Sequence, residues 1–221
     1  MEPEHPLNAE PHCCPKSSDR ISPSILLAIF FAMVTAATLP LAAQVEALTR
    51  PVNLATLARR AEVIVQGRVV ATRYEPMPGY SNIRTVVVTL EVQRMLRGPS
   101  GTHFTFRQYL GGAPRRGGKA VYASGEQVLL FLPGESSAGL RSPLALEQGH
   151  FNIRRGTAGD EYIANKMGNA GLFRRVPEDA QRAGLKLADD QMQLVATPKG
   201  PVPLPAFMSL LEDLMTLPKQ E

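Results

Sequence analysis

Cysteine is almost absent from this 221-residue chain. Its two cysteines, Cys13 and Cys14, are adjacent, and both precede the only long apolar run. Because everything after that run lacks cysteine, the main body can hold no disulfide, no thiolate nucleophile and no cysteine-ligated metal. The body must therefore fold without cross-links, and the chain is long enough to bury a core of its own.

Tryptophan is absent too, and aromatic residues make up only 6% of the chain. The core must therefore rest on Val, Leu, Ile and Phe. Histidine is equally scarce, because the body contains only His103 and His150. A metal site needs three or four ligands at suitable spacing. We therefore expect no metal and no cofactor.

No familiar catalytic motif is complete in the sequence. The GxSxG pattern of serine hydrolases is missing, and GESSAG at residues 134–139 has the wrong order. The glycine-rich stretch around Lys119 fails as a phosphate-binding loop, because Ala120 stands where Ser or Thr should bind magnesium. We therefore expect a non-enzymatic protein. A hydrolase whose site is assembled from distant residues remains an alternative.

The one long apolar run, SILLAIFFAMVTAATLPLAAQVEA at residues 24–47, follows Lys16 and Arg20 and ends in small residues. A basic flank, an apolar segment and a small-residue cleavage site are the layout of a secretory signal. We therefore assign residues 1–47 to a signal peptide and expect a secreted or periplasmic body. The alternative is an uncleaved membrane anchor at residues 25–43, again with the body outside the cytoplasm.

Residues 48–155 carry the alternation typical of β-strands. A short leading helix that Asn53 can cap is followed by a strand with Gly67 in its middle, where we expect a bulge or bend. The clearest period-two pattern is TVVVTLEVQRMLRG at residues 85–98. Four to five closely spaced strands predict a mainly β fold, a five-stranded antiparallel barrel of the oligonucleotide-binding (OB) type.

The stretch SGEQVLLFLPG at residues 124–134 has five large apolar residues in succession, residues 128–132. A continuously apolar strand is typical of a strand that is covered on both faces. We therefore interpret it as barrel interior and not as the floor of an active site.

The last part of the chain is less regular. We expect residues 156–202 to form an irregular connector, with a short hairpin around Tyr162 and Ile163 that is turned by residues 166–169. Residues 203–218 are predicted to form a C-terminal amphipathic helix. Its apolar face consists of residues at i, i+3, i+4 and i+7, namely Phe207, Leu210, Leu211 and Leu214.

The first half of the body is strongly basic, with 15 Lys and Arg against 6 Asp and Glu in residues 50–155. Binding residues usually lie on loops of a rigid scaffold, so we expect the partner to meet the basic loop at Arg115, Arg116 and Lys119. Arg107 and Tyr109 of HFTFRQY, residues 103–109, are the next candidates.

An alternative is that the barrel face binds a polyanion or a single-stranded nucleic acid. Aromatic residues interleaved with Arg can stack bases while the cation meets phosphate. Phe104 and Phe106 share one face of HFTFRQY, however, and two Phe residues on one strand face are usually core. Export also removes the protein from most nucleic acid, so we expect no nucleic-acid partner.

The order of these segments resembles the netrin-like domains, the OB-type barrels found in tissue inhibitors of metalloproteinases, and exported bacterial proteins with the same arrangement. The resemblance rests on Ala61-Glu62-Val63 at the entry to the first strand, Leu96-Arg97-Gly98 at the end of the second, and Gly125-Glu126 before the apolar strand. It implies a netrin-like barrel. Metalloproteinase inhibition in that family uses an N-terminal cysteine, which this body lacks. We therefore expect an envelope or extracellular binding protein with an unknown partner.

Overall fold

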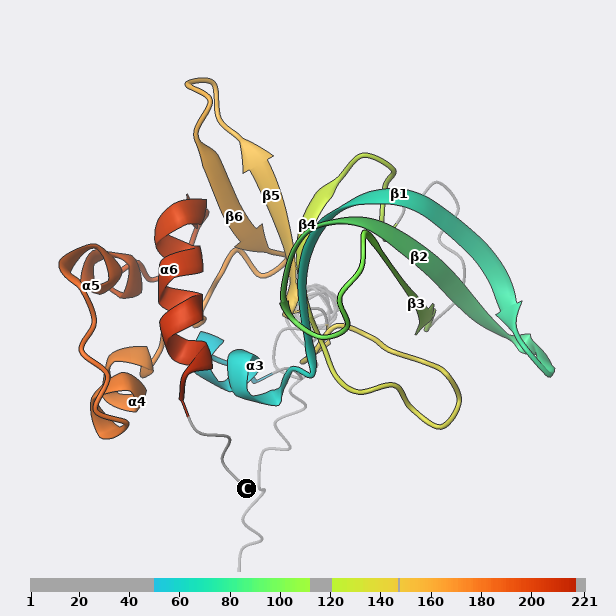
Figure 1. Ribbon diagram of the computed structural model, residues 1–221, viewed down its shortest axis with the longest axis horizontal. Helices are drawn as coiled ribbons and strands as arrows, with labels where there is room; N and C mark the ends of the chain where they lie inside the picture. Colours follow the sequence, from blue (N-terminus) through green and yellow to red (C-terminus); the bar gives the residue numbers. More distant parts are fainter. Residues whose placement is uncertain (1–49, 112–120, 147, 218–221) are drawn as a thin grey trace, which may run out of the picture. The chain divides into compact units, whose positions relative to one another are not determined.

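The computed structural model describes residues 50–111, 121–146 and 148–217, which contain one antiparallel sheet and four helices (Figure 1). The sheet has seven strands in the order β3-β2-β1-β4-β5-β6-β7. Its strands are β1 (Val63–Met77), β2 (Tyr80–Arg97), β3 (His103–Tyr109), β4 (Gln127–Leu132), β5 (His150–Arg155), β6 (Glu161–Asn165) and β7 (Val202–Pro203). The helices are α3 (Leu54–Arg60), α4 (Val176–Arg182), α5 (Asp189–Val195) and α6 (Leu204–Met215).

The mainly β prediction is confirmed, but the closed five-stranded barrel is not, because the sheet of the described residues is open. β3 and β7 form its two ends. To close a barrel, β5 would have to offer its outer edge to β3. That edge pairs with β6 instead, from Phe151 opposite Asn165 to Arg155 opposite Glu161. The sheet therefore continues past the fifth strand.

The stretch at residues 124–134 contains β4, which is buried on both faces as its continuous apolar pattern predicts. All five residues from 128 to 132 have no exposed surface. Leu129 and Phe131 belong to one hydrophobic cluster, and Val128, Leu130 and Leu132 belong to the other. β4 therefore separates two cores on opposite faces of the sheet.

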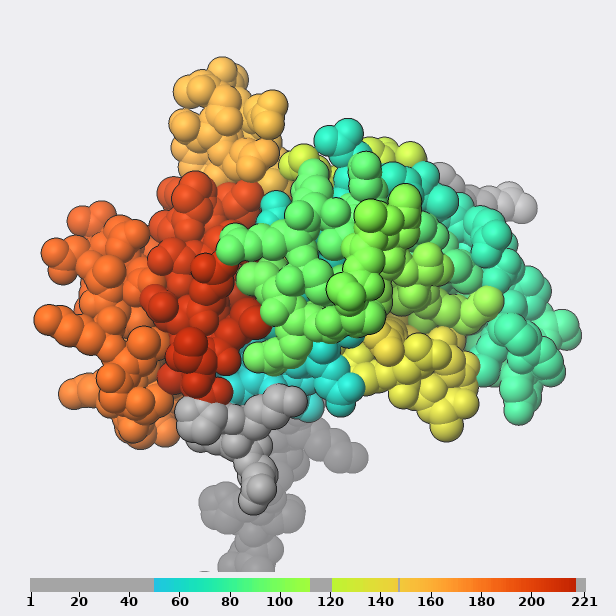
Figure 2. Space-filling model, in the orientation of Figure 1, coloured from blue at the N-terminus to red at the C-terminus, as the bar shows by residue number. Residues whose placement is uncertain are grey.

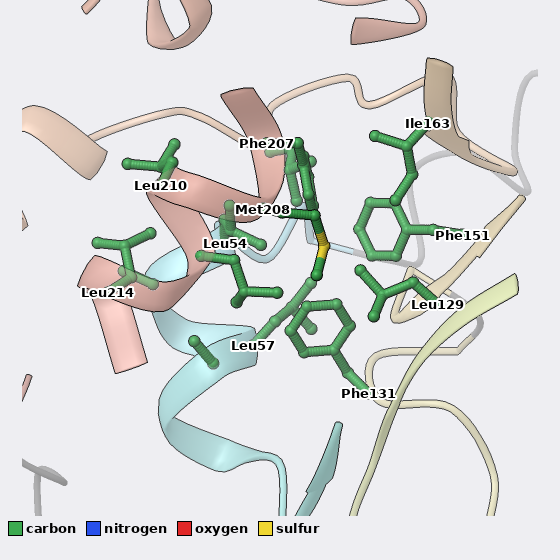
Figure 3. Close-up of a cluster of buried hydrophobic side chains, with 14 of the residues drawn as sticks. Leu54, Leu57, Leu129, Phe131, Phe151, Ile163, Phe207, Met208, Leu210 and Leu214 are labelled. Carbon is green, nitrogen blue, oxygen red and sulfur yellow. The ribbon is translucent and has the colours of Figure 1, made fainter. Parts of the chain in front are cut away.

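We call the first cluster the helix-side core, because α3 and α6 cover it (Figure 3). Phe151 lies between two aromatic neighbours, with ring centroids 5.5 Å from Phe131 and 5.4 Å from Phe207. The amphipathic C-terminal helix is confirmed, since all four residues of its predicted apolar face are fully buried. The leading helix is confirmed as well, because the Asn53 side chain accepts a hydrogen bond from the Thr56 amide.

The second cluster is the strand-side core. Its buried members come from β1 to β4 together with Tyr122: Val63, Val65, Val69, Val86, Val88, Leu90, Phe104, Phe106, Tyr122, Val128, Leu130 and Leu132. Two polar side chains are buried beside it. The Tyr122 hydroxyl donates a hydrogen bond to Gln108 Oε1 at 2.8 Å, and the His150 ring stacks on Tyr122 at 4.8 Å.

Gly67 marks an irregularity in β1, as predicted. The pairing register between β1 and β2 shifts between Gln66 and Gly67. A Cβ atom at Gly67 would lie 2.6 Å from the Glu91 carbonyl oxygen, so any other residue would push the two strands apart. Glycine is therefore required here by the close approach of the neighbouring backbone.

The connector expected at residues 156–202 is more ordered than its polar sequence suggests, because it contains β6, α4 and α5. The hairpin around Tyr162 forms with β5 across residues 156–160, and not across residues 166–169. Both helices have only seven residues, too few to be stable alone. Contacts such as that of Gln191 with Asp213 of α6, at 2.6 Å, hold them in place.

Among the described residues, no helix is long and apolar enough to cross a membrane. The apolar run at residues 24–47 lies outside the described residues, so the signal-peptide and anchor predictions both remain predictions.

Candidate functional site

The three basic loop residues predicted to contact a partner, Arg115, Arg116 and Lys119, lie outside the described residues. Arg107 and Tyr109 are described, and both lie on the face of β3 that looks away from the strand-side core. The opposite face of β3 carries Phe104 and Phe106, which are buried in that core. These two rings are therefore core, as their spacing predicts, and they cannot stack nucleotides.

Arg107 uses its guanidinium group inside the protein. Nη2 forms an ion pair with Glu75 Oε1 at 2.6 Å, and Nη1 donates a hydrogen bond to Thr85 Oγ1 at 3.0 Å. Thr85 is buried, and its hydroxyl donates to the Glu75 carbonyl oxygen at 2.8 Å. Arg107 therefore fastens β3 to the end of β1, and its charge is balanced by Glu75.

The structure places an extended hairpin next to Arg107, which we call the arm and define as residues 73–84. In the arm, β1 and β2 pair with each other, since β4 pairs with β1 up to Arg68 and β3 joins β2 from Thr85. At its base the Leu110 amide donates to the Arg84 carbonyl oxygen at 3.0 Å. None of its residues is buried. Figure 1 shows the arm as the right-hand end of the β1–β2 ribbon, and it projects in the same direction in Figure 2.

Exposed tyrosines lie on the arm and beside it, on both faces of the sheet. Tyr74 is 57% exposed and Tyr80 is 56% exposed, and Tyr109 at the adjoining end of β3 is 51% exposed. Tyr109 lies opposite Thr85, the first residue after the arm. Of these three tyrosines, only Tyr109 is predicted from the sequence to contact a partner. Only the strand register shows that it lies near the arm.

A second surface, which the sequence pattern does not predict, is a groove of about 570 Å³ over β5 and β6. We call it the basic groove. It is lined by Asn152, Arg154, Arg155, Gly156, Tyr162, Ala164, Asn165, Lys166, Gly168 and Pro201. Arg154 lies opposite Tyr162 and Asn152 lies opposite Ala164, so each pair lies on one face of the sheet. Asn152 also lies opposite Val128, which places the groove at the margin of the strand-side core.

Cationic side chains are part of the lining of the basic groove. Three cationic residues line it, and no Asp or Glu is present among the described residues of its lining. Arg155 forms an ion pair with Glu161 at 3.4 Å. A neighbouring cavity that shares Arg155 and Tyr162 is different, because its lining includes Asp160 and Glu161.

The turn that carries Lys166 is held by two buried asparagines. The Asn165 amide donates to Asn169 Oδ1 at 3.0 Å, and the Asn169 amide donates back to Asn165 Oδ1 at 2.9 Å. Asn169 Nδ2 also donates to the carbonyl oxygens of Ile163, at 3.0 Å, and Gly200, at 2.9 Å. Asn169 has a φ of 59°, a left-handed conformation that Asn tolerates better than most residues. This network fixes one wall of the basic groove.

The two histidines of the body differ in burial and in their polar contacts. His103 is exposed on β3, with Nδ1 at 3.2 Å from the Thr102 hydroxyl. His150 is buried, and among the described residues neither of its ring nitrogens has a hydrogen-bond partner. Burial, and secondarily the charge of Lys166, lowers the pKa of His150 to about 4. The imidazole is therefore neutral at pH 7.

Neither histidine has the surroundings of a catalytic base among the described residues. The polar contact of His103 is the Thr102 hydroxyl, and the ring of His150 stacks on Tyr122. In the same part of the chain, no group of three or more His, Cys, Asp or Glu side chains could hold a metal ion. In comparisons with known proteins, no protein-family model and no curated protein matches this sequence.

Proposed function

We propose that this protein is an exported, non-enzymatic binding protein that contacts a partner protein through the arm and the adjoining end of β3. The observation that carries the proposal is that exposed tyrosines lie on both faces of the arm region, with Tyr74 opposite Val86 on one face and Tyr109 opposite Thr85 on the other. Tyr74, Tyr80 and Tyr109 each expose more than half of their surface.

Tyrosine is well suited to such a surface. Its ring provides a large contact area, its hydroxyl can find a partner in water or in another protein, and few rotatable bonds must be fixed on binding. Tyrosine is accordingly enriched where protein interfaces are most buried.

The length of β1 and β2 supports the proposal. They have 15 and 18 residues, whereas strands of five to six residues are most common. The residues of the arm add nothing to either core, because none of them is buried. A two-stranded ribbon exposed on both faces is only marginally stable by itself. An extension of this kind is typical of a segment that serves contact and not folding.

We further propose that β1 to β5 form an OB-type, netrin-like module that β6 and β7 extend. The sequential pairing of β1, β2 and β3, with β4 returning to the other edge of β1, supports this assignment. Residues 1–47 are proposed to be a signal peptide, with an anchor at residues 25–43 as the alternative. Determining the N-terminus of the protein isolated from its producing cells decides between them. A start near residues 44–48 indicates cleavage, and retention of Met1 indicates an anchor.

The binding proposal is tested by photo-crosslinking in the cells that produce the protein. A photoreactive amino acid replaces Tyr80 or Tyr109, and Met192, which is 47% exposed on α5, is replaced as the control. We expect one discrete protein adduct from positions 80 and 109 and none from position 192. The absence of an adduct at both tyrosine positions, or the same adduct at position 192, would contradict the proposal.

A further inference from the structure

A cavity of about 290 Å³ lies where the segment before α3 meets the turns before α4. We call it the arginine cavity, because three of the residues that line it are Arg50, Arg174 and Arg175. It shares no lining residue with the basic groove. Its volume is at the lower end of the roughly 300–1,000 Å³ of ligand pockets, so it suits a small ionic group better than a large organic body.

One wall of the arginine cavity is held by a buried glutamine. The Val52 amide donates to Gln148 Oε1 at 2.8 Å, and Gln148 Nε2 donates to the Arg50 carbonyl oxygen at 3.3 Å. Because Gln148 is buried, these two bonds fix the backbone that carries Arg50 to the body of the protein.

The two walls are joined to each other by hydrogen bonds. The Leu54 amide donates to the Leu172 carbonyl oxygen at 2.8 Å, and Asn53 Nδ2 donates to the Arg174 carbonyl oxygen at 3.0 Å. The backbones that carry Arg50 and Arg174 are therefore held in a fixed relation. A site held in this way loses little conformational entropy when a ligand binds.

Two unusual backbone conformations lie in the second wall. Gly171 has a φ of 71°, and a Cβ atom there would lie 2.9 Å from Pro51 Cβ, so the two walls are in close contact. Arg175 has a φ of 61°, a left-handed conformation that is uncommon for a residue other than glycine. Such conformations persist only where the surrounding structure fixes them, and they are frequent at ligand-binding sites.

The polar groups of the arginine cavity are suited to an anion. All three arginines are exposed, and among the described residues none of them forms an ion pair. The described lining contains no Asp or Glu. Like charges around one cavity repel each other, and a bound anion relieves that repulsion.

The nearby polar groups of the backbone and of Asp179 are already bonded. Asp179 Oδ2 accepts a hydrogen bond from Asn53 at 2.9 Å, and its Oδ1 pairs with Arg182 at 2.6 Å. The Thr56 amide donates to Asn53 Oδ1 at 2.9 Å. Recognition of an anion in this cavity therefore depends on the guanidinium groups.

We propose that the arginine cavity binds a phosphate group, to which Arg50 and Arg174 donate paired hydrogen bonds while Arg175 adds positive charge. An arginine matches the geometry of phosphate with two parallel hydrogen bonds. A phosphate monoester carries about 1.5 to 2 negative charges at pH 7 and three strong acceptor oxygens, so it can serve more than one guanidinium group. A carboxylate has one charge and two oxygens. The phosphate belongs to a soluble ester or to a lipid headgroup, and the site does not depend on the partner protein proposed for the arm.

The test uses the purified protein at physiological ionic strength. Isothermal titration calorimetry compares glycerol 3-phosphate with acetate, and co-sedimentation compares phosphatidylcholine vesicles with and without phosphatidic acid. We expect glycerol 3-phosphate to bind at least tenfold more tightly than acetate. Binding of glycerol 3-phosphate alone assigns the site to a soluble ester, and additional binding to the phosphatidic acid vesicles assigns it to a lipid headgroup. Equal affinity for acetate, or no binding of glycerol 3-phosphate at millimolar concentration, would overturn the proposal even if the vesicles bind.

A charge-removing pair of substitutions locates the site. R50Q/R174Q is expected to weaken glycerol 3-phosphate binding at least tenfold. The matched control R68Q/R73Q removes two exposed arginines of β1 that do not line the cavity, and it should change the affinity less than twofold. Circular dichroism confirms that each variant is folded before titration. Equal weakening by both pairs would mean that general charge attracts the probe, and the proposal would be wrong.

A second pair of substitutions keeps the charge and removes the guanidinium groups. R50K/R174K leaves the net charge unchanged, but a lysine cannot donate two parallel hydrogen bonds to one phosphate. We expect glycerol 3-phosphate to bind at least threefold more weakly to this variant than to the wild type. Unchanged affinity would contradict recognition by the guanidinium groups of Arg50 and Arg174.

Discussion

The arm and the basic groove are both exposed surfaces of one sheet, but they are built differently. The arm consists of two strands with solvent on both sides and no buried residue. The groove lies over β5 and β6, whose other face carries Phe151, Ile153 and Ile163 of the helix-side core. The charge of Arg107 beside the arm is balanced by Glu75, whereas the lining of the groove has no carboxylate among the described residues.

Exposure and charge alone therefore do not locate a ligand site. An arginine can hold the fold together, as Arg107 does, or remain available to a ligand, as we propose for Arg174. The neighbouring side chains decide between these roles. One wall of the groove is fixed by the hydrogen bonds of Asn165 and Asn169, whereas the arm offers an exposed hairpin to a large partner.

The largest loss of stability is expected from a substitution in the wall of the groove. Asn169→Ala removes the side-chain hydrogen bonds to Asn165, Ile163 and Gly200, and it leaves a left-handed backbone without the residue that tolerates it. We expect a loss of about 3 to 4 kcal/mol in the free energy of unfolding, measured by urea denaturation. A loss below about 1 kcal/mol would show that the wall is not held by this network.

The next largest effect is a loss of stability at acidic pH that is due to His150. In the unfolded chain His150 has the usual pKa of about 6.5, and in the folded protein burial lowers it to about 4. The unfolded state therefore binds the proton more readily, and protonation of His150 lowers the free energy of unfolding. This loss is absent above pH 6.5, grows as the pH falls and reaches its full size near pH 4. The pKa difference corresponds to about 3 kcal/mol of lost stability.

The comparison of wild type with His150→Phe isolates this effect. Between pH 7 and pH 4 the wild type should lose about 3 kcal/mol more unfolding free energy than the variant, as measured by urea denaturation at each pH. Parallel pH profiles for the two proteins would mean that His150 is not a buried neutral imidazole.

A smaller effect is expected where the arm is fastened. Glu75→Gln removes the ion pair with Arg107, and both partners are partly exposed, so solvent screens their interaction. We expect a loss of about 0.5 kcal/mol in unfolding free energy together with faster proteolytic cleavage within the arm. Unchanged cleavage would indicate that Arg107 does not hold the arm.

The smallest effect on stability is expected on the arm itself. Tyr80→Ser should change the unfolding free energy by less than about 0.5 kcal/mol, because the side chain is mostly exposed. The same substitution should remove the adduct formed by a photoreactive residue at position 109. An adduct of undiminished yield would show that Tyr80 does not contact the partner.

The sequence predicts the parts of the fold that depend on local pattern. Five successive apolar residues predict that β4 is covered on both sides, and the 3.6-residue spacing of Phe207, Leu210 and Leu214 predicts the face of α6. The bulge at Gly67 follows from a glycine in the middle of an alternating strand. Each of these features is decided by residues close to one another in the chain.

The basic groove could not be predicted, because its residues come together only through the register of β5 against β6. A shift of one residue would move Arg154 and Asn152 to the opposite face. The open sheet was missed for a related reason, since the sequence predicts a hairpin around Tyr162 and Ile163 but not the pairing of β6 with β5 in the same sheet. α4 and α5 were missed because tertiary contacts, such as that of Gln191 with Asp213, stabilise them more than their own sequence does.

Amide hydrogen exchange followed by mass spectrometry compares the two surfaces in a single experiment. If the groove is preformed and the arm is free, peptides that cover residues 150–155 and 161–169 exchange slowly, while residues 73–84 exchange fastest among the strands. Equal protection of the two regions, or faster exchange in β5 and β6 than in the arm, would contradict the distinction between strands held by the helix-side core and an exposed arm.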